Sequence, residues 1–251
     1  MESWKLNDGT QLQSFNFKNK INANGIEFQP GKSVVFYKDG EIKGGMLAKD
    51  VVVNGMNFKK GTLLYLYQNG KIEQGFLSKP TVLPNKIKLA ANTWVQFSND
   101  GKIKKAFEDT KIVHTFDHNI RLNSNSQILP NKVEVGGQKY LRAEFRHDGS
   151  VANGIASRVQ VDGVTFISGD IKFSPSGKVV NATGGIVIAN NLVMHEPIFN
   201  QSGGLESARL SYDTKINGRS FPAYSTIVFD NKMNILKIRY LKCLASNCRM
   251  H

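Results

Sequence analysis

The stretch Thr62–Leu77, TLLYLYQNGKIEQGFL, carries the pattern on which most of the chain is built. A run of β-forming residues ends in Gln68-Asn69-Gly70, and apolar residues then recur at alternate positions up to Phe76. Asn-Gly suits a tight turn because such a turn needs positive φ, which glycine adopts freely and asparagine tolerates. The stretch therefore predicts a β-hairpin.

The same turn signal recurs about every thirty residues. Tips that align on Gly70 occur at Asp8-Gly9, Asp39-Gly40, Asp100-Gly101, Asp148-Gly149, Ser176-Gly177, Gly203-Gly204 and Lys232-Met233. A second series alternates with them at Asn24-Gly25, Asn54-Gly55, Asn85-Lys86, His118-Asn119, Gly136-Gly137, Asp162-Gly163, Asn190-Asn191 and Asn217-Gly218. A fixed period is the signature of a repeat architecture.

These two series predict an all-β fold, an antiparallel up-and-down meander of about eight hairpin repeats that forms a barrel or a layered sheet array. Each limb between opposite tips is about fifteen residues long, so we expect bends midway, as at Lys59-Lys60-Gly61 and Ser78-Lys79-Pro80. No amphipathic helical window stands out. We interpret 1–251 as a single β-repeat domain with an irregular segment at 102–148, where the rhythm breaks.

Composition indicates a globular protein with a basic surface. Apolar residues make up 40% of the chain and the formal net charge is +13, an excess that favours polyanionic partners such as polysaccharide, lipid head groups or nucleic acid. Because the lysines are scattered beside turns, solvated lysines that protect exposed strands are the alternative. No window is long and apolar enough for a transmembrane helix.

The two cysteines, Cys243 and Cys248, have neither the second cysteine pair nor the histidine spacing of a zinc site. We expect a disulfide between them, which goes with an extracytoplasmic bacterial protein, periplasmic or secreted, whose leader has been removed. The alternative is a cytoplasmic protein with two free thiols. The oligomeric state stays open.

The repeat resembles that of MORN-type proteins at Phe36-Tyr37-Lys38-Asp39-Gly40 and at Tyr65–Gly70, each followed by glycine near the fifth position, at Gly45 and Gly75. The resemblance is short and covers about five of the eight units. It implies a scaffold or a surface that binds proteins or lipids, and it supplies no catalytic residues.

The sequence offers little for catalysis. It has no nucleophile elbow, phosphate loop or dinucleotide fingerprint, and we expect no cofactor and no metal site. The polar residues with the best prospect of forming an enzyme site are His114, Asp117, His118, Glu144 and His147. His114 and His118 would share a strand face, but zinc normally has three or four ligands, so a polar turn is the favoured interpretation.

For binding, β-rich proteins place exposed aromatic rings beside basic residues. The candidates are Trp94, Lys102, Lys104, Lys105, Arg142 and Arg146. We expect a non-catalytic binding or scaffold protein that uses a sheet surface to hold a polyanionic or protein partner. The alternative is an enzyme, such as a carbohydrate-active hydrolase, with its site in a barrel mouth.

Overall fold

The computed structural model describes residues 2–5, 11–23, 25–108, 133–244 and 247–250. These residues form strands and turns, with one three-residue 3-10 turn, η1 (Pro84–Lys86), and no α-helix among them. Contacts divide the chain into unit 1, Met1–Gly136 with His147–Gly149, and unit 2, Gly137–Arg146 with Ser150–His251. The all-β prediction is confirmed, and the single domain over 1–251 stays a prediction.

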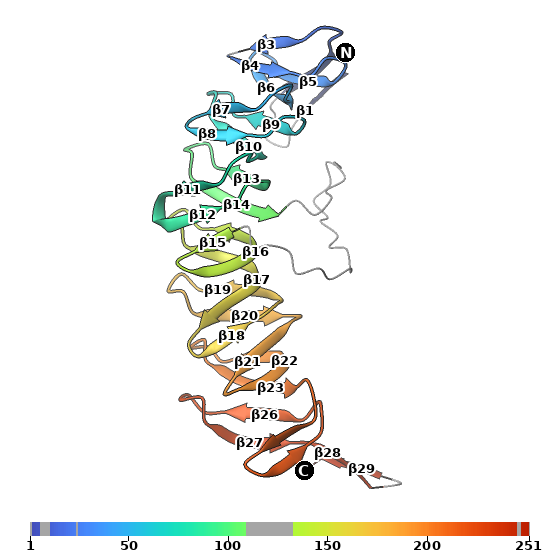
Figure 1. The fold of residues 1–251 in the computed structure, drawn as a ribbon, viewed down its shortest axis with the longest axis vertical. Coiled ribbons are helices and arrows are strands. Elements are labelled where there is room, and N and C mark those ends of the chain that lie inside the picture. The colour runs from blue at the N-terminus through green and yellow to red at the C-terminus, as the bar shows by residue number, and fades with distance from the viewer. Residues whose placement is uncertain (1, 6–10, 24, 109–132, 245–246, 251) are drawn as a thin grey trace. The chain divides into compact units, whose positions relative to one another are not determined.

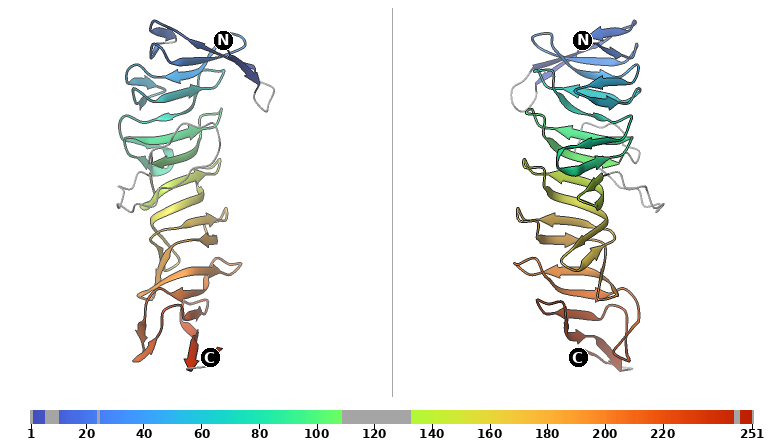
Figure 2. Two further views of the ribbon diagram at one scale, coloured as in Figure 1. Left: turned by 90° about the vertical axis from the view of Figure 1, so that its right-hand side faces the viewer. Right: turned by 60° about the vertical axis from the view of Figure 1, so that its left-hand side comes forward.

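Unit 1 is an open antiparallel meander of large hairpins with small hairpins set between them (Figure 1, Figure 2). Its strands are β1 (Glu2–Lys5), β2 (Gln11–Asn16), β3 (Ile21–Ala23), β4 (Ile26–Phe28), β5 (Ser33–Tyr37), β6 (Ile42–Met46), β7 (Val51–Val53), β8 (Met56–Phe58), β9 (Leu63–Leu66), β10 (Ile72–Phe76), β11 (Thr81–Leu83), β12 (Ile87–Leu89), β13 (Thr93–Phe97), β14 (Ile103–Glu108) and β15 (Val133–Val135). The main series pairs in the order β1, β2, β5, β6, β9, β10, β13, β14. The small hairpins are β3–β4, β7–β8 and β11–β12, and β12 also pairs with β15.

Unit 2 continues the same kind of meander with longer strands. Its strands are β16 (Gln138–Phe145), β17 (Val151–Val161), β18 (Val164–Phe166), β19 (Asp170–Phe173), β20 (Val179–Thr183), β21 (Ile186–Ala189), β22 (Leu192–Phe199), β23 (Leu205–Leu210), β24 (Thr214–Ile216), β25 (Arg219–Phe221), β26 (Thr226–Phe229), β27 (Ile235–Arg239), β28 (Leu241–Leu244) and β29 (Asn247–Met250). One series runs β16, β17, β19, β20, and a second runs β17, β18, β21, β22, β23, β26, β27. Among the described strands neither unit's series closes on itself, so the barrel alternative is wrong.

The tips that recur about every thirty residues share one geometry. In each of the seven described tips, a backbone N–H donates to the carbonyl four residues later, with Tyr67 to Lys71 as the example at 2.8 Å. The residue between them, glycine in six of the tips and Met233 (φ +66°) in the seventh, lies in the left-handed region, with φ +76° at Gly70 and +90° at Gly101. This is the three-residue hairpin loop with a glycine bulge. At the sixth of the seven described tips Gly203, not Gly204, holds this position, because its N–H donates to the carbonyl of Asn200 and its φ is +85°.

The intervening tips are turns of a different kind. Both central residues have positive φ, as in Asn54 (+49°) and Gly55 (+77°), or Asp162 (+47°) and Gly163 (+81°). That is the two-residue type I′ turn, whose twist matches the twist of the strands that it joins. The tip predicted at His118-Asn119 lies outside the described residues.

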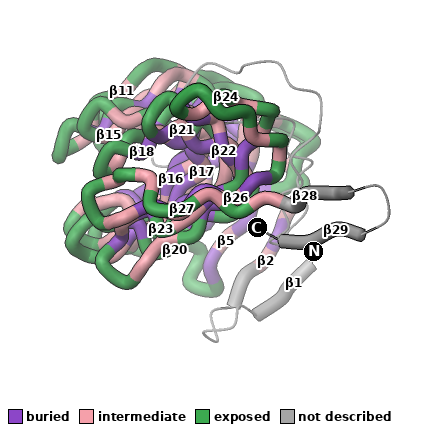
Figure 3. The backbone as a smooth tube through the Cα atoms, turned by 90° about the horizontal axis from the view of Figure 1, so that it is seen from below, coloured by how far each residue is buried: buried purple, intermediate pink, exposed green. Residues whose placement is uncertain are grey.

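The core of unit 1 lies between the main sheet and the small hairpins, and Figure 3 shows buried segments along the strands and exposed turns. Phe58 of β8 is fully buried and packs against Gly75 of the next large hairpin. A Cβ on Gly75 would lie 2.7 Å from Phe58 Cδ1, and one on Gly45 would lie 2.8 Å from Phe28 Cδ1. Glycine is needed there because each ring occupies the space of a side chain, and each buried ring contributes about 1.5–3 kcal/mol.

The predicted bends occur in unit 1 but are not general. Turns at Lys59-Lys60-Gly61 and bends at Ser78-Lys79 separate large from small hairpins. In unit 2, however, β17 runs unbroken for 11 residues, pairing first with β16 and β19 and then with β18.

Candidate functional site

The candidate site is a polar sheet face on β16, β17, β19 and β20 of unit 2. One row of directly opposed residues crosses the four strands and consists of Glu144, Asn153, Lys172 and Asn181. The second row, two residues along each strand, consists of Arg142, Ile155, Asp170 and Thr183. Since alternate residues of a strand point to one face, seven polar side chains and one isoleucine share this surface.

Burial explains why these side chains face outward. The residues between them are small or apolar and buried on the other face: Ala143, Gly154, Ile171 and Ala182. Gly154 has no side chain because the buried ring of Tyr140 fills that space, with its Cδ1 2.6 Å from where a Cβ would lie. Burial raises the pKa of Tyr140 to about 12.

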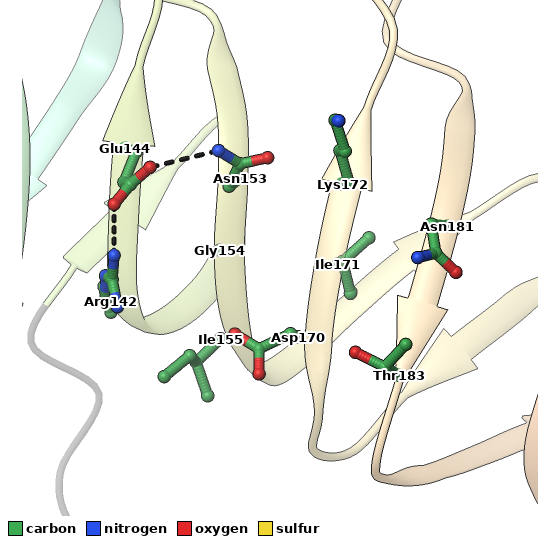
Figure 4. A pocket seen from close by; sticks show the side chains of 10 residues that line it. All are labelled: Arg142, Glu144, Asn153, Gly154, Ile155, Asp170, Ile171, Lys172, Asn181 and Thr183. Carbon is green, nitrogen blue, oxygen red and sulfur yellow. Dashed lines mark hydrogen bonds and ion pairs between the residues drawn. The ribbon is translucent and has the colours of Figure 1, made fainter. Parts of the chain in front are cut away.

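A cavity of about 250 Å³ lies over this face and is lined by both rows (Figure 4). Part of its lining is already paired. The Arg142 guanidinium forms an ion pair with Glu144, and Asn153 Nδ2 donates to Glu144 Oε2 at 3.0 Å. These bonds hold three side chains from β16 and β17 in fixed orientations.

The rest of the lining is unpaired. Asp170, Lys172, Asn181 and Thr183 are exposed, and none has a side-chain hydrogen bond or ion pair to another described residue. Figure 4 shows them on β19 and β20, beside the paired group. The cavity therefore offers an anion, a cation, an amide and a hydroxyl to a ligand.

Of the residues predicted from the sequence, Arg142 and Glu144 line this cavity. Arg146 does not. Its guanidinium donates to the carbonyl of Val151 at 2.6 Å and to that of Phe173. This is the role that Tyr37 and Tyr67 play in unit 1, where their hydroxyls donate to the carbonyls of Leu66 (3.0 Å) and Phe97 (2.8 Å).

The other basic and aromatic candidates lie on β13, β14 and the tip between them in unit 1. Trp94 is half-buried and stacks on Phe107 with ring centroids 4.3 Å apart. Lys102 and Lys104 are exposed, and Lys105 lies opposite Gln96. Trp94 is therefore packed against its neighbouring strand, and the three lysines do not line the cavity.

The polar cluster is described only in part. His114, Asp117 and His118 lie outside the described residues. His147 Nε2 lies 3.6 Å from Asp100 Oδ2 and 2.5 Å from Lys102 Nζ, at an exposed tip. A hydrogen bond from Ser98, a backbone bond from Lys102 and the nearby His147 lower the pKa of Asp100. No group of three potential metal ligands occurs in the described part of the chain.

The cysteines lie on the hairpin β28–β29, where the backbone register places Cys243 directly opposite Cys248. Their side chains are outside the described part. Directly opposed strand residues have Cα separations of about 4.5–5.5 Å, within the range that a disulfide spans.

The residues that sequence reasoning missed are Asn153, Asp170, Lys172, Asn181 and Thr183. Asn153 and Asn181 each lie four positions after a tip glycine, so the repeat spacing indicated that they are equivalent, but it did not indicate which side chains meet across the strands. Arg142 was singled out for its charge rather than for its register.

A comparison with protein families and with curated proteins found no match to this chain. The structure itself supports the coarser part of the MORN resemblance, an antiparallel meander of many hairpins. No helix among the described residues is long and apolar enough to cross a membrane.

Proposed function

We propose that this chain is a non-catalytic binding or scaffold protein that holds a polyanionic polymer or a protein against the sheet face of unit 2. The observation that carries the proposal is the polar face itself, on which exposed groups without partners stand in two cross-strand rows. The resemblance to MORN-type repeats supports a surface of this kind, since it implies a scaffold for proteins or lipids.

Charge supports a polyanionic partner. The exposed side chains on the strands of the large hairpins in unit 2 include the cations Lys172, Arg209, Lys237 and Arg239 and the anions Asp170, Glu196 and Glu206. Arg209 pairs with Glu196 at 3.2 Å, whereas Lys237 and Arg239 on β27 are exposed. The chain as a whole has a net charge of +13, and such an excess attracts polyanions at long range.

Binding of heparin, lipopolysaccharide, anionic lipid vesicles and single-stranded DNA, each titrated with salt, tests this proposal. We expect affinity for at least one of them to fall steeply as salt rises. The double variant Lys237→Gln/Arg239→Gln should weaken that binding more than Lys215→Gln/Arg219→Gln, a matched loss of two charges on the small hairpin β24–β25. Absence of binding to every polymer at low ionic strength would refute the polyanion proposal.

A second candidate is a carbohydrate-active hydrolase. Glu144 and Asp170 line the same cavity, and glycoside hydrolysis commonly uses two carboxyl groups around one bond. Release of reducing sugar from a polysaccharide, abolished by both Glu144→Gln and Asp170→Asn, would favour this candidate over binding alone.

A further inference from the structure

We propose that the cavity over β16, β17, β19 and β20 binds one sugar unit of a polysaccharide. The inference rests on the proposed function and selects the ligand class among the polymers considered there. It starts from the four lining side chains that have no partner among the described residues, Asp170, Lys172, Asn181 and Thr183.

These groups match a run of sugar hydroxyls. The carboxylate of Asp170 only accepts hydrogen bonds, the Lys172 ammonium only donates them, and Asn181 and Thr183 do both. A hydroxyl is a donor and an acceptor at once, so neighbouring hydroxyls on a ring satisfy Asp170 and Lys172 together. A phosphodiester group or a sulfate ester group offers acceptors alone and leaves Asp170 without a donor.

The charge of the cavity argues against phosphate-dense ligands. Its two cations, Arg142 and Lys172, are balanced by Glu144 and Asp170, and Arg142 is already paired with Glu144. A phosphate drawn to Lys172 would approach the like charge of Asp170, two residues away on the same face of β19. That repulsion is absent for a hydroxyl.

Size and shape fit a monomer unit. The cavity of about 250 Å³ is below the range of about 300–1,000 Å³ typical of small-molecule sites. Neighbouring strands lie about 4.8 Å apart, so polar groups on β17, β19 and β20 are within reach of a single ring. Ile155 stands between Arg142 and Asp170 in its row and supplies an apolar contact for the ring's C–H groups.

The test is isothermal titration of the full chain with glucomannan, polygalacturonate, dextran sulfate and single-stranded DNA, comparing wild type with Asp170→Asn. Hydrogen bonds to a charged group are worth about 1.5–3 kcal/mol, so loss of the carboxylate should weaken binding of glucomannan, which carries no charge that Asp170 would repel, about tenfold or more. The same variant should bind dextran sulfate and DNA equally well or more tightly, because a repelling charge is removed.

Glu206→Gln is the matched control, since Glu206 is an exposed carboxylate on β23 that does not line the cavity. Thr183→Val is a second variant that keeps the β-branched shape and removes one hydroxyl, and it should weaken glycan binding alone. If glycans fail to bind while DNA or dextran sulfate binds, or if Asp170→Asn matches Glu206→Gln on glycans, the sugar site is refuted and the proposed function stands. If no polymer binds, the sugar site and the polyanionic version of the proposed function are both refuted.

Discussion

Replacing Gly75 with alanine tests the packing that defines the repeat. The added methyl would lie 2.7 Å from Phe58 Cδ1 and 2.9 Å from Leu64 Cδ1. Both side chains are fully buried, so neither can move into solvent. Overpacking of this kind costs about 1–3 kcal/mol, and the reduced entropy of the unfolded chain offsets about 0.4–1 kcal/mol of it. We expect the free energy of unfolding of unit 1 to fall by about 1–2 kcal/mol.

Urea denaturation followed by tryptophan fluorescence is the appropriate assay. The chain has two tryptophans, Trp4 and Trp94, and both belong to unit 1, so the signal reports that unit. The midpoint should move to lower urea with Gly75→Ala, and by less when the same change is made in the Phe58→Leu variant, because the smaller side chain leaves room for the methyl.

Ala106 provides a comparison with Gly75. It holds the corresponding position of the following large hairpin, five residues after the tip glycine, and is fully buried. Here the reverse change, Ala106→Gly, should destabilise by about 1–2 kcal/mol through lost burial and added backbone entropy. Wild-type stability of Gly75→Ala, or a loss of stability from Gly75→Ala that is as large in the Phe58→Leu variant as in the wild type, would refute the account in which Phe58 fills the space beside Gly75.

Four further predictions follow from the described contacts. Arg146→Met removes the bonds to the carbonyls of Val151 and Phe173 and should cost about 1–3 kcal/mol in urea denaturation followed by circular dichroism, whereas exposed Arg158→Met should cost little. Because burial raises the pKa of Tyr140 to about 12, the folded state holds a proton that the unfolded chain releases near pH 10. The stability contributed by Tyr140 is lost between pH 10 and 12, on the order of 2–3 kcal/mol, and Tyr140→Phe should remove that part of the pH dependence, leaving the part due to Tyr65 and Tyr67, whose pKa values burial also raises. Tyr224 has φ +64°, a conformation that costs a non-glycine residue about 1–2 kcal/mol, so Tyr224→Asn should raise the melting temperature, and an unchanged or lower value would contradict the strain. If Cys243 and Cys248 form a disulfide, mass spectrometry without reductant should find the chain lighter by two hydrogens, and alkylation of both thiols would show that they are free.

Much of the fold could be predicted from the sequence because its signals are local. A reversal such as Gln68-Asn69-Gly70 is specified by the φ values that its residues can adopt, and seven such tips have the same bonded geometry in the structure. Barrel closure depends instead on how strands pair over long distances. The choice between Gly203 and Gly204 also needed the hydrogen bond of Gly203 to Asn200, since both residues tolerate the turn.

The candidate site was predicted only through Arg142 and Glu144. Asp170, Lys172 and Asn181 lie on different strands, and their proximity depends on the cross-strand register, which local patterns do not specify. Arg146, in contrast, was singled out for its charge but does not line the cavity. Its charge suggests a ligand contact, but its place at the tip gives it a carbonyl-bonding role that tyrosine fills elsewhere.

The hydrogen bonds from Tyr37 to Leu66 and from Tyr67 to Phe97 each span one repeat. Donor and acceptor therefore occupy the same two places in successive copies, so a tandem duplication of one complete repeat would reproduce both partners and extend unit 1 without redesign. An insertion of half that length would instead put a type I′ turn where a bulged tip belongs. Gene duplication can therefore extend such a chain only by whole repeats.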